Sequence, residues 1–150
     1  MRRVRRVLCL AAIWPLLVAA ADLSAALAER NLEKRSHKAL ENAERALKAA
    51  QQAYQRGDLP HTQAALEELR ASVELAHRSL QQTGKDPSRS PKHFKHAEIK
   101  TRELLRRLDH FRQGMAFDDR QAVEPVRAAI AAIHDDLLLG IMSKKNKRAR

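Results

Sequence analysis

The sequence ALKAAQQAYQRGDLPHTQAALEELRASVEL, residues 46–75, predicts a helix, a tight turn and a second helix. Most of its residues are Ala, Leu, Glu, Lys, Gln or Arg, which are good helix formers. In the turn, Gly57 suits the position after a helix C-terminus, Asp58 suits an N-cap, and Pro60 fits a first helical turn. Because the connection is so short, we expect the two helices to form an antiparallel hairpin.

Apolar and small residues recur every three or four positions on both sides of this turn, as in amphipathic helices. At 100° per residue each set falls on one face, which predicts one helix over 29–56 and another over 59–82. The two sets are Leu32, Ser36, Ala39, Ala43, Ala46, Leu47, Ala50, Ala53 and Tyr54, and then Ala65, Leu66, Leu69, Val73, Ala76 and Leu80.

A third helix is predicted after the loop TGKDPSRSP, residues 83–91. Ser90 followed by Pro91 is typical of an N-cap with proline in the first turn, so we place this helix over 91–113. The residues expected on its buried face are Phe94, Ala97, Thr101, Leu104, Leu105, Leu108 and Phe111.

The fourth predicted helix covers 119–142, with Val123, Val126, Ile130, Ile133, Leu137 and Ile141 on one face. Pro125 lies too deep for the first turn of a helix capped at Asp118, so either that turn is irregular or the regular helix begins nearer Ala122. No alternating β-branched run occurs in the chain. The expected fold is all-α, an up-down four-helix bundle of two antiparallel helical hairpins over 29–143.

The N-terminal residues 1–28 have the three-part layout of a signal peptide. The basic stretch MRRVRR precedes an apolar stretch over 7–21, and Ala26 and Ala28 stand at the −3 and −1 positions of a cleavage site. Cleavage after Ala21 and retention as an anchor are the alternatives. The apolar stretch falls short of the roughly 20 residues that span a bilayer. We therefore expect an exported protein, periplasmic or secreted, with at most a peripheral membrane contact.

Much of the formal net charge of +11 comes from the two ends of the chain. The segment 1–28 contributes +3 and the segment 144–150, KKNKRAR, contributes +5, so 29–143 carries only +3. A segment so rich in charge is predicted to be disordered. It is either a solubilising end or a contact with an anionic envelope surface, such as lipid headgroups or polysaccharide, through Lys144, Lys145, Lys147, Arg148 and Arg150. Export and the few aromatic residues argue against nucleic acid.

The sequence LLLGIM, residues 137–142, stands just before this basic tail. Leu137 and Ile141 belong to the buried stripe, whereas Leu138 falls at its edge and Leu139 on the opposite face. Leu138 and Leu139 are either ordinary exposed residues or a small contact for a protein partner or a second copy of the chain.

The residues needed for most catalytic sites are missing from the sequence. Cys9 is the only cysteine and lies in the predicted signal peptide, so the processed chain would have no thiol nucleophile, disulfide or Cys-ligated metal. No Gly-rich phosphate loop and no clustered set of acids is present. We therefore expect no catalytic residues, no cofactor and no enzymatic activity.

Histidines offer the alternative of a metal- or haem-binding bundle. His134 falls inside the stripe of the fourth helix, where we expect one hydrogen bond to a neighbouring helix. His93 and His96 lie one turn apart on the third helix, His93 at the stripe boundary and His96 facing solvent. A metal site needs further converging ligands, and the next positions on that flank are Lys100 and Arg107.

The sequence thus predicts a small exported helical-bundle protein of the cell envelope. Its expected role is non-catalytic binding, as a scaffold or chaperone-like protein, and this role is inferred by analogy with the fold class.

Overall fold

The computed structural model describes residues 22–147, and it describes side chains as far as Ser143. The described part of the chain is all-helical, as the sequence predicts. The elements are α1 (Ser24–Leu27), α2 (Leu32–Gln55), α3 (Leu59–Gln82), α4 (Pro91–Gln113), the 3-10 helix η1 (Asp118–Ala122) and α5 (Glu124–Lys147). Most of the predicted signal peptide, residues 1–21, lies outside the described residues. None of the described helices combines the length and the apolar content needed to cross a membrane.

The turn between α2 and α3 has the geometry that its sequence predicts. Gly57 adopts a φ of 74°, a conformation that costs glycine little and other residues more. The side chain of Asp58 accepts a hydrogen bond from the backbone nitrogen of His61 at 3.2 Å and so caps α3. Pro60 lies in the first turn of α3, where its missing N–H would have no partner in any case.

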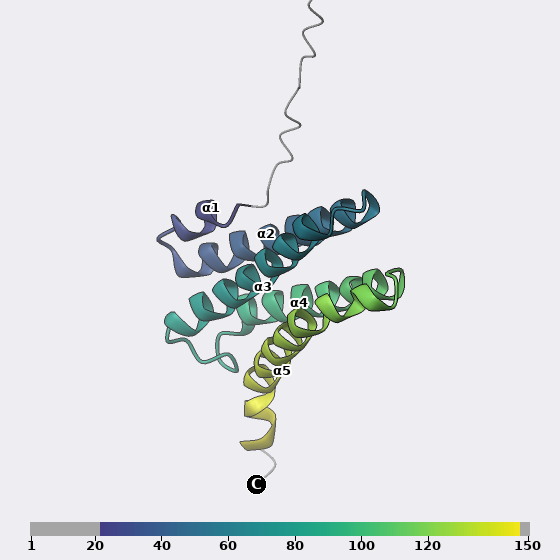
Figure 1. Cartoon of the computed structure of the whole chain (residues 1–150). Helices are drawn as coiled ribbons and strands as arrows, with labels where there is room; N and C mark the ends of the chain where they lie inside the picture. The colour runs from purple at the N-terminus through teal and green to yellow at the C-terminus, as the bar shows by residue number, and fades with distance from the viewer. Residues whose placement is uncertain (1–21, 148–150) are drawn as a thin grey trace, which may run out of the picture.

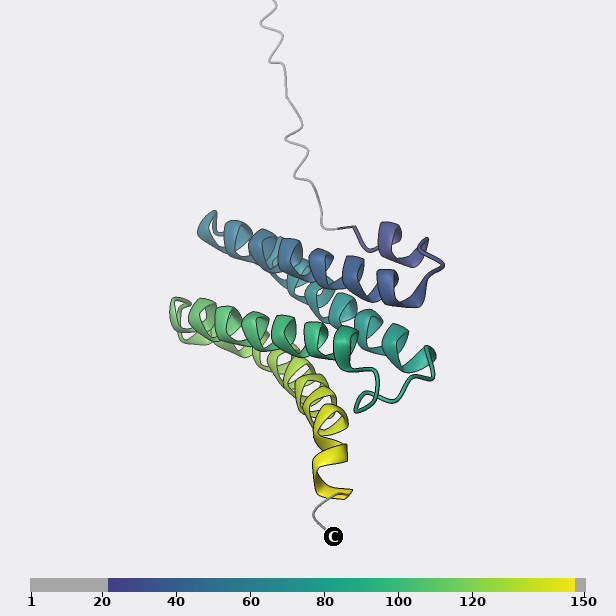
Figure 2. The same cartoon turned by 180° about the vertical axis from the view of Figure 1, so that it is seen from behind.

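Four long helices pack as two stacked pairs, α2 with α3 and α4 with α5 (Figures 1 and 2). Contacts between the pairs show how they are stacked. The α2 residues Glu33, His37 and Glu44 meet the α4 residues His93, His96 and Lys100. The residue numbers rise together on both sides, so α4 lies alongside α2 and runs in the same direction.

The centre of the molecule is an apolar core to which all four long helices contribute. Leu47, Leu69, Leu108 and Ile130, one from each of these helices, are fully buried in it. A second cluster near the other end contains Leu40, Leu80, Phe94 and Leu137, together with Ala26 of the short helix α1. The apolar stripes read from the sequence therefore supply the core, and the stripe residues that are only partly buried are Leu32, Tyr54, Ala65, Leu105, Ile133 and Ile141.

The start of α5 confirms the irregularity that Pro125 predicts. The chain forms a 3-10 helix over Asp118–Ala122 before α5 begins at Glu124, which places Pro125 in the first turn. The hydroxyl of Tyr54 ties this segment to the end of α2. It donates to Asp119 Oδ2 at 2.9 Å and accepts from the backbone nitrogen of Ala116 at 2.8 Å.

Helix α5 continues to Lys147, five residues beyond the predicted end near residue 142. The disordered tail predicted over 144–150 stays a prediction, and residues 148–150 lie outside the described residues. Gly140 does not interrupt the helix, and the residues after it include no proline. Basic residues in a last helical turn also interact favourably with the helix dipole.

Candidate functional site

A shallow groove follows the line along which α2 and α4 meet. It consists of three adjoining depressions of about 420, 370 and 380 Å³. The first two share Glu33 and His93, and the last two share Glu41, so the three form one continuous feature, here called the α2–α4 groove. Between Glu33 and Lys48 it follows α2 for about 22 Å, at 1.5 Å per residue.

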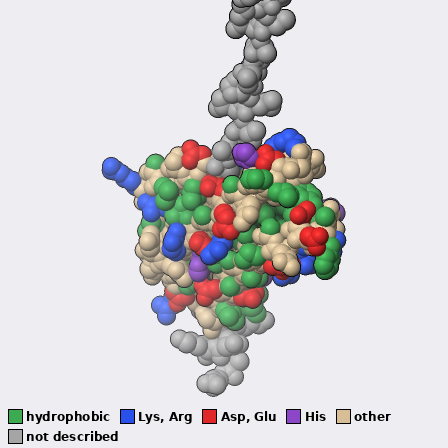
Figure 3. Space-filling model, in the orientation of Figure 1, with side chains coloured by type: hydrophobic (Ala, Val, Ile, Leu, Met, Phe, Trp, Pro, Cys, Tyr) green, Lys and Arg blue, Asp and Glu red, His purple; other side chains and the backbone are tan. Residues whose placement is uncertain are grey.

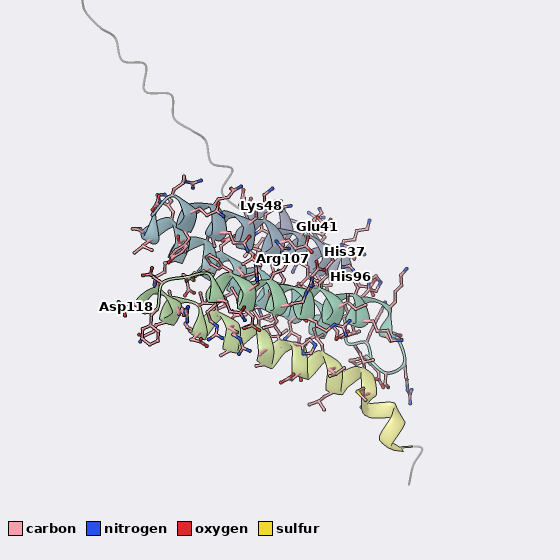
Figure 4. All side chains as sticks on the ribbon, turned by 90° about the vertical axis from the view of Figure 1, so that its right-hand side faces the viewer. His37, Glu41, Lys48, His96, Arg107 and Asp118 are labelled. Carbon is pink, nitrogen blue, oxygen red and sulfur yellow. The ribbon has the colours of Figure 1, made fainter. Side chains whose placement is uncertain are left out.

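Three contacts across the seam hold α2 and α4 together beside this groove. Glu33 Oε2 lies 3.2 Å from His93 Nε2, and its other carboxylate oxygen accepts from Lys85 Nζ at 2.6 Å. Further along, Lys100 Nζ donates to Glu44 Oε1 at 2.7 Å. Between the Glu33–His93 and Glu44–Lys100 contacts, the rings of His37 and His96 stack (Figure 4).

The expected position of His96 was wrong, because its ring lies at a helix interface instead of facing solvent. It stacks on His37 with a centroid distance of 3.9 Å and an interplanar angle of 14°. Burial lowers the pKa of His96 below its ordinary value of 6.5, and the nearby His37, Lys100 and His93 lower this pKa further. Glu44 alone opposes these effects, so the folded protein favours the neutral ring.

Acidification should destabilise the fold through His96. Because its pKa is lower in the folded state than in the unfolded chain, the unfolded chain binds more protons as pH falls below 6.5. The contribution of His96 to the free energy of unfolding is therefore expected to fall between pH 7.5 and pH 5.5. The His96→Gln variant, which cannot titrate at this position, should show a smaller fall when melting temperatures are measured over this range.

The matched control for this measurement is His110→Gln, since His110 is an exposed histidine on the same helix. Its melting temperatures are measured over the same pH range and compared with those of the His96→Gln protein. An identical pH dependence in the His96→Gln protein would contradict the assignment of the effect to the stacked pair.

His134 makes the interhelical hydrogen bond that the sequence predicts. Its Nε2 lies 3.1 Å from Oε1 of Glu98 on α4, and both side chains are largely buried. Arg102 approaches the same Glu98 oxygen at 3.7 Å. Burial of Glu98 was not expected from the sequence, and the contacts with His134 and Arg102 explain how α4 accommodates a carboxylate there.

The histidines proposed as metal or haem ligands occupy separate places. His93 is paired with Glu33 at one end of the α2–α4 groove, and His134 lies between α4 and α5. Within residues 22–143, no three side chains of His, Cys, Asp or Glu come together as a metal-binding group.

The two leucines proposed as a partner contact are exposed. Leu139 is 70% exposed and Leu138 is 37% exposed, and Met142, one helical turn beyond Leu138, is 48% exposed. These three residues are here called the apolar end of α5. The last turns of α5 extend beyond the other helices (Figures 1 and 2), and hydrophobic side chains reach the surface in this lower region (Figure 3).

The basic residues proposed for a polyanion contact come directly after the apolar end of α5 in the sequence. The backbone of Lys144, Lys145 and Lys147 belongs to α5, whereas their side chains, and all of Arg148 and Arg150, lie outside the described residues. Gly140 packs closely against the loop before α4, since a Cβ atom there would lie 3.2 Å from Pro87 Cγ.

No family model, curated protein or solved structure matches the chain. The candidate sites therefore depend on their own geometry and charge.

Proposed function

We propose that this chain is a small exported protein of the cell envelope, built as an up-down four-helix bundle, that acts by binding a partner and not by catalysis. The observation that carries the proposal is the apolar end of α5. Leu138, Leu139 and Met142 form a hydrophobic surface on a helix that extends away from the core. A protein partner would bury these side chains and gain roughly 25 cal/mol for each Å² of apolar area removed from water.

Export is proposed on the basis of the N-terminal sequence, and the packing of α1 bears on where processing would occur. Ala26 of α1 is only 1% exposed and packs in the same cluster as Leu40 and Leu80. Cleavage after Ala28 would remove α1 from this cluster, whereas cleavage after Ala21 would leave it in place. We therefore favour cleavage after Ala21.

A single-cysteine variant, Leu139→Cys, tests the proposal in intact cells. The processed chain would have no cysteine of its own, because Cys9 lies in the predicted signal peptide. We expect a membrane-impermeant thiol reagent to label the thiol introduced at position 139. A thiol crosslinker should join this thiol to the partner and give one discrete adduct. The mass of the recovered chain should correspond to residues 22–150.

The matched control is Gln52→Cys, at an exposed position of α2 away from the apolar end of α5. It should be labelled by the impermeant reagent but should give no adduct. Failure of the reagent to reach either position would refute export, and equal adducts from both positions would refute docking through α5. Stoichiometric metal or haem in protein purified from its native compartment would instead favour the alternative role for His134 or for His93 and His96.

A further inference from the structure

The α2–α4 groove is more positively charged than the rest of the folded body. Its three depressions are lined by eight basic and three acidic side chains, a net charge of +5 with the histidines neutral. The whole segment 29–143 carries only +3. The remainder of that segment is therefore net −2, so the positive charge of the fold is concentrated along this one groove.

Several of these cations are not neutralised within the protein. Lys38 and Lys85 are paired with Glu29 and Glu33. In contrast, across the described residues, Lys34, Lys48 and Arg107 have no carboxylate within ion-pair distance. They are spread along the groove, with Lys48 and Arg107 on facing helices toward the α2–α3 turn (Figure 4).

The shape of the groove limits what could neutralise these charges. Its depressions are shallow and open, and the cations follow a line instead of converging on one point. A chain with regularly spaced negative groups fits such a line better than a single small anion does. None of the lining residues is Phe, Tyr or Trp, so the large aromatic side chains on which nucleic-acid bases usually stack are absent from the three depressions.

We propose that the α2–α4 groove binds a linear anionic polysaccharide. This binding is electrostatic and multivalent, so it weakens as salt screens the charges. It uses a surface distinct from the apolar end of α5, and it goes beyond the proposed docking role by adding a second ligand of different chemistry. The envelope location in the proposed function is where an anionic glycan would be met.

The test measures the affinity of the purified full chain for heparin, a linear sulfated glycan, by titration calorimetry at low and moderate salt. The groove variant carries Lys34→Gln, Lys48→Gln and Arg107→Gln. The control variant carries Arg56→Gln, Arg78→Gln and Arg106→Gln, which are exposed positions outside the three depressions. Both variants lose three positive charges and keep the basic tail, and thermal melts check that both remain folded.

We expect the groove variant to bind heparin roughly tenfold more weakly than the unmodified chain, and the control variant to bind within about twofold of it. Equal losses in the two variants would show that only net charge matters, and no loss in either would assign binding to another surface. Either result would overturn the proposal.

A single-stranded oligonucleotide of matched charge is the second probe. Tighter binding of the oligonucleotide than of heparin would overturn the assignment to a glycan. Because these measurements use purified protein and leave Leu139 and the N-terminal residues unchanged, their outcome is independent of the crosslinking test of export and docking.

Discussion

Replacement of Leu108 by alanine is expected to lower the free energy of unfolding by about 3 kcal/mol, because it removes a fully enclosed side chain and leaves a cavity. Leu108 is 0% exposed and lies in the central cluster to which α2, α3, α4 and α5 all contribute. For a chain of this size, the melting temperature should fall by roughly 10 °C. Urea titration followed by circular dichroism would measure both the stability and the slope of its dependence on urea.

The control for Leu108→Ala is Leu139→Ala, which makes the same chemical change at a 70% exposed position. Its effect should stay within about 0.5 kcal/mol. A loss below about 1 kcal/mol for Leu108→Ala would mean that the two helical pairs do not enclose this residue, and the stacked arrangement would then be wrong.

The helices and most of the core could be predicted from the sequence because both depend on local rules. Leu108 was placed on the buried face by its spacing from Leu104 and Phe111, and the structure buries all three. The turn at Gly57 and Asp58 could also be predicted, because a positive φ and an N-cap position each favour only a few residue types. These features require no knowledge of which helix packs against which.

The errors concern residues whose environment depends on how the pairs stack. Helix α4 contacts α2, α3 and α5, so its buried surface is wider than a single apolar stripe. This explains why Glu98 is buried and why His96 lies at an interface. Asn42 on α2 is a polar residue buried within one pair, against α3. Its side-chain amide donates to Glu68 Oε1 at 2.7 Å and to Ser72 Oγ at 2.9 Å, and these bonds allow a polar residue to be fully buried.

The α2–α4 groove could not be predicted for the same reason. Lys48 and Arg107 are far apart in the sequence and become neighbours only because α4 lies parallel to α2 in one particular register. The periodicity of each helix is unaffected by a shift of that register. The apolar end of α5, in contrast, was predictable because Leu138 and Leu139 follow from the spacing within one helix.

The close packing of α2 against α3 predicts a second large loss of stability, when a small buried residue between these helices is replaced by a larger one. Ala46 is 0% exposed and lies one turn after Asn42, whose amide contacts Ser72 of α3, so it faces that helix. The substitution Ala46→Leu adds three carbons where α2 otherwise presents mostly alanine, including Ala39, Ala43 and Ala50. Leucine is nearly as good a helix former as alanine, so the cost comes from packing.

We expect Ala46→Leu to lower the free energy of unfolding by about 2 kcal/mol, because the added atoms force α2 and α3 apart or into strained rotamers. The control is Ala64→Leu, the same change at an exposed position of α3, which should alter stability by less than about 0.5 kcal/mol. Urea titration at constant pH would compare the two. If Ala46→Leu left stability unchanged or raised it, space for a larger side chain would exist between α2 and α3. The alanine stripe would then not be what sets the distance between these helices.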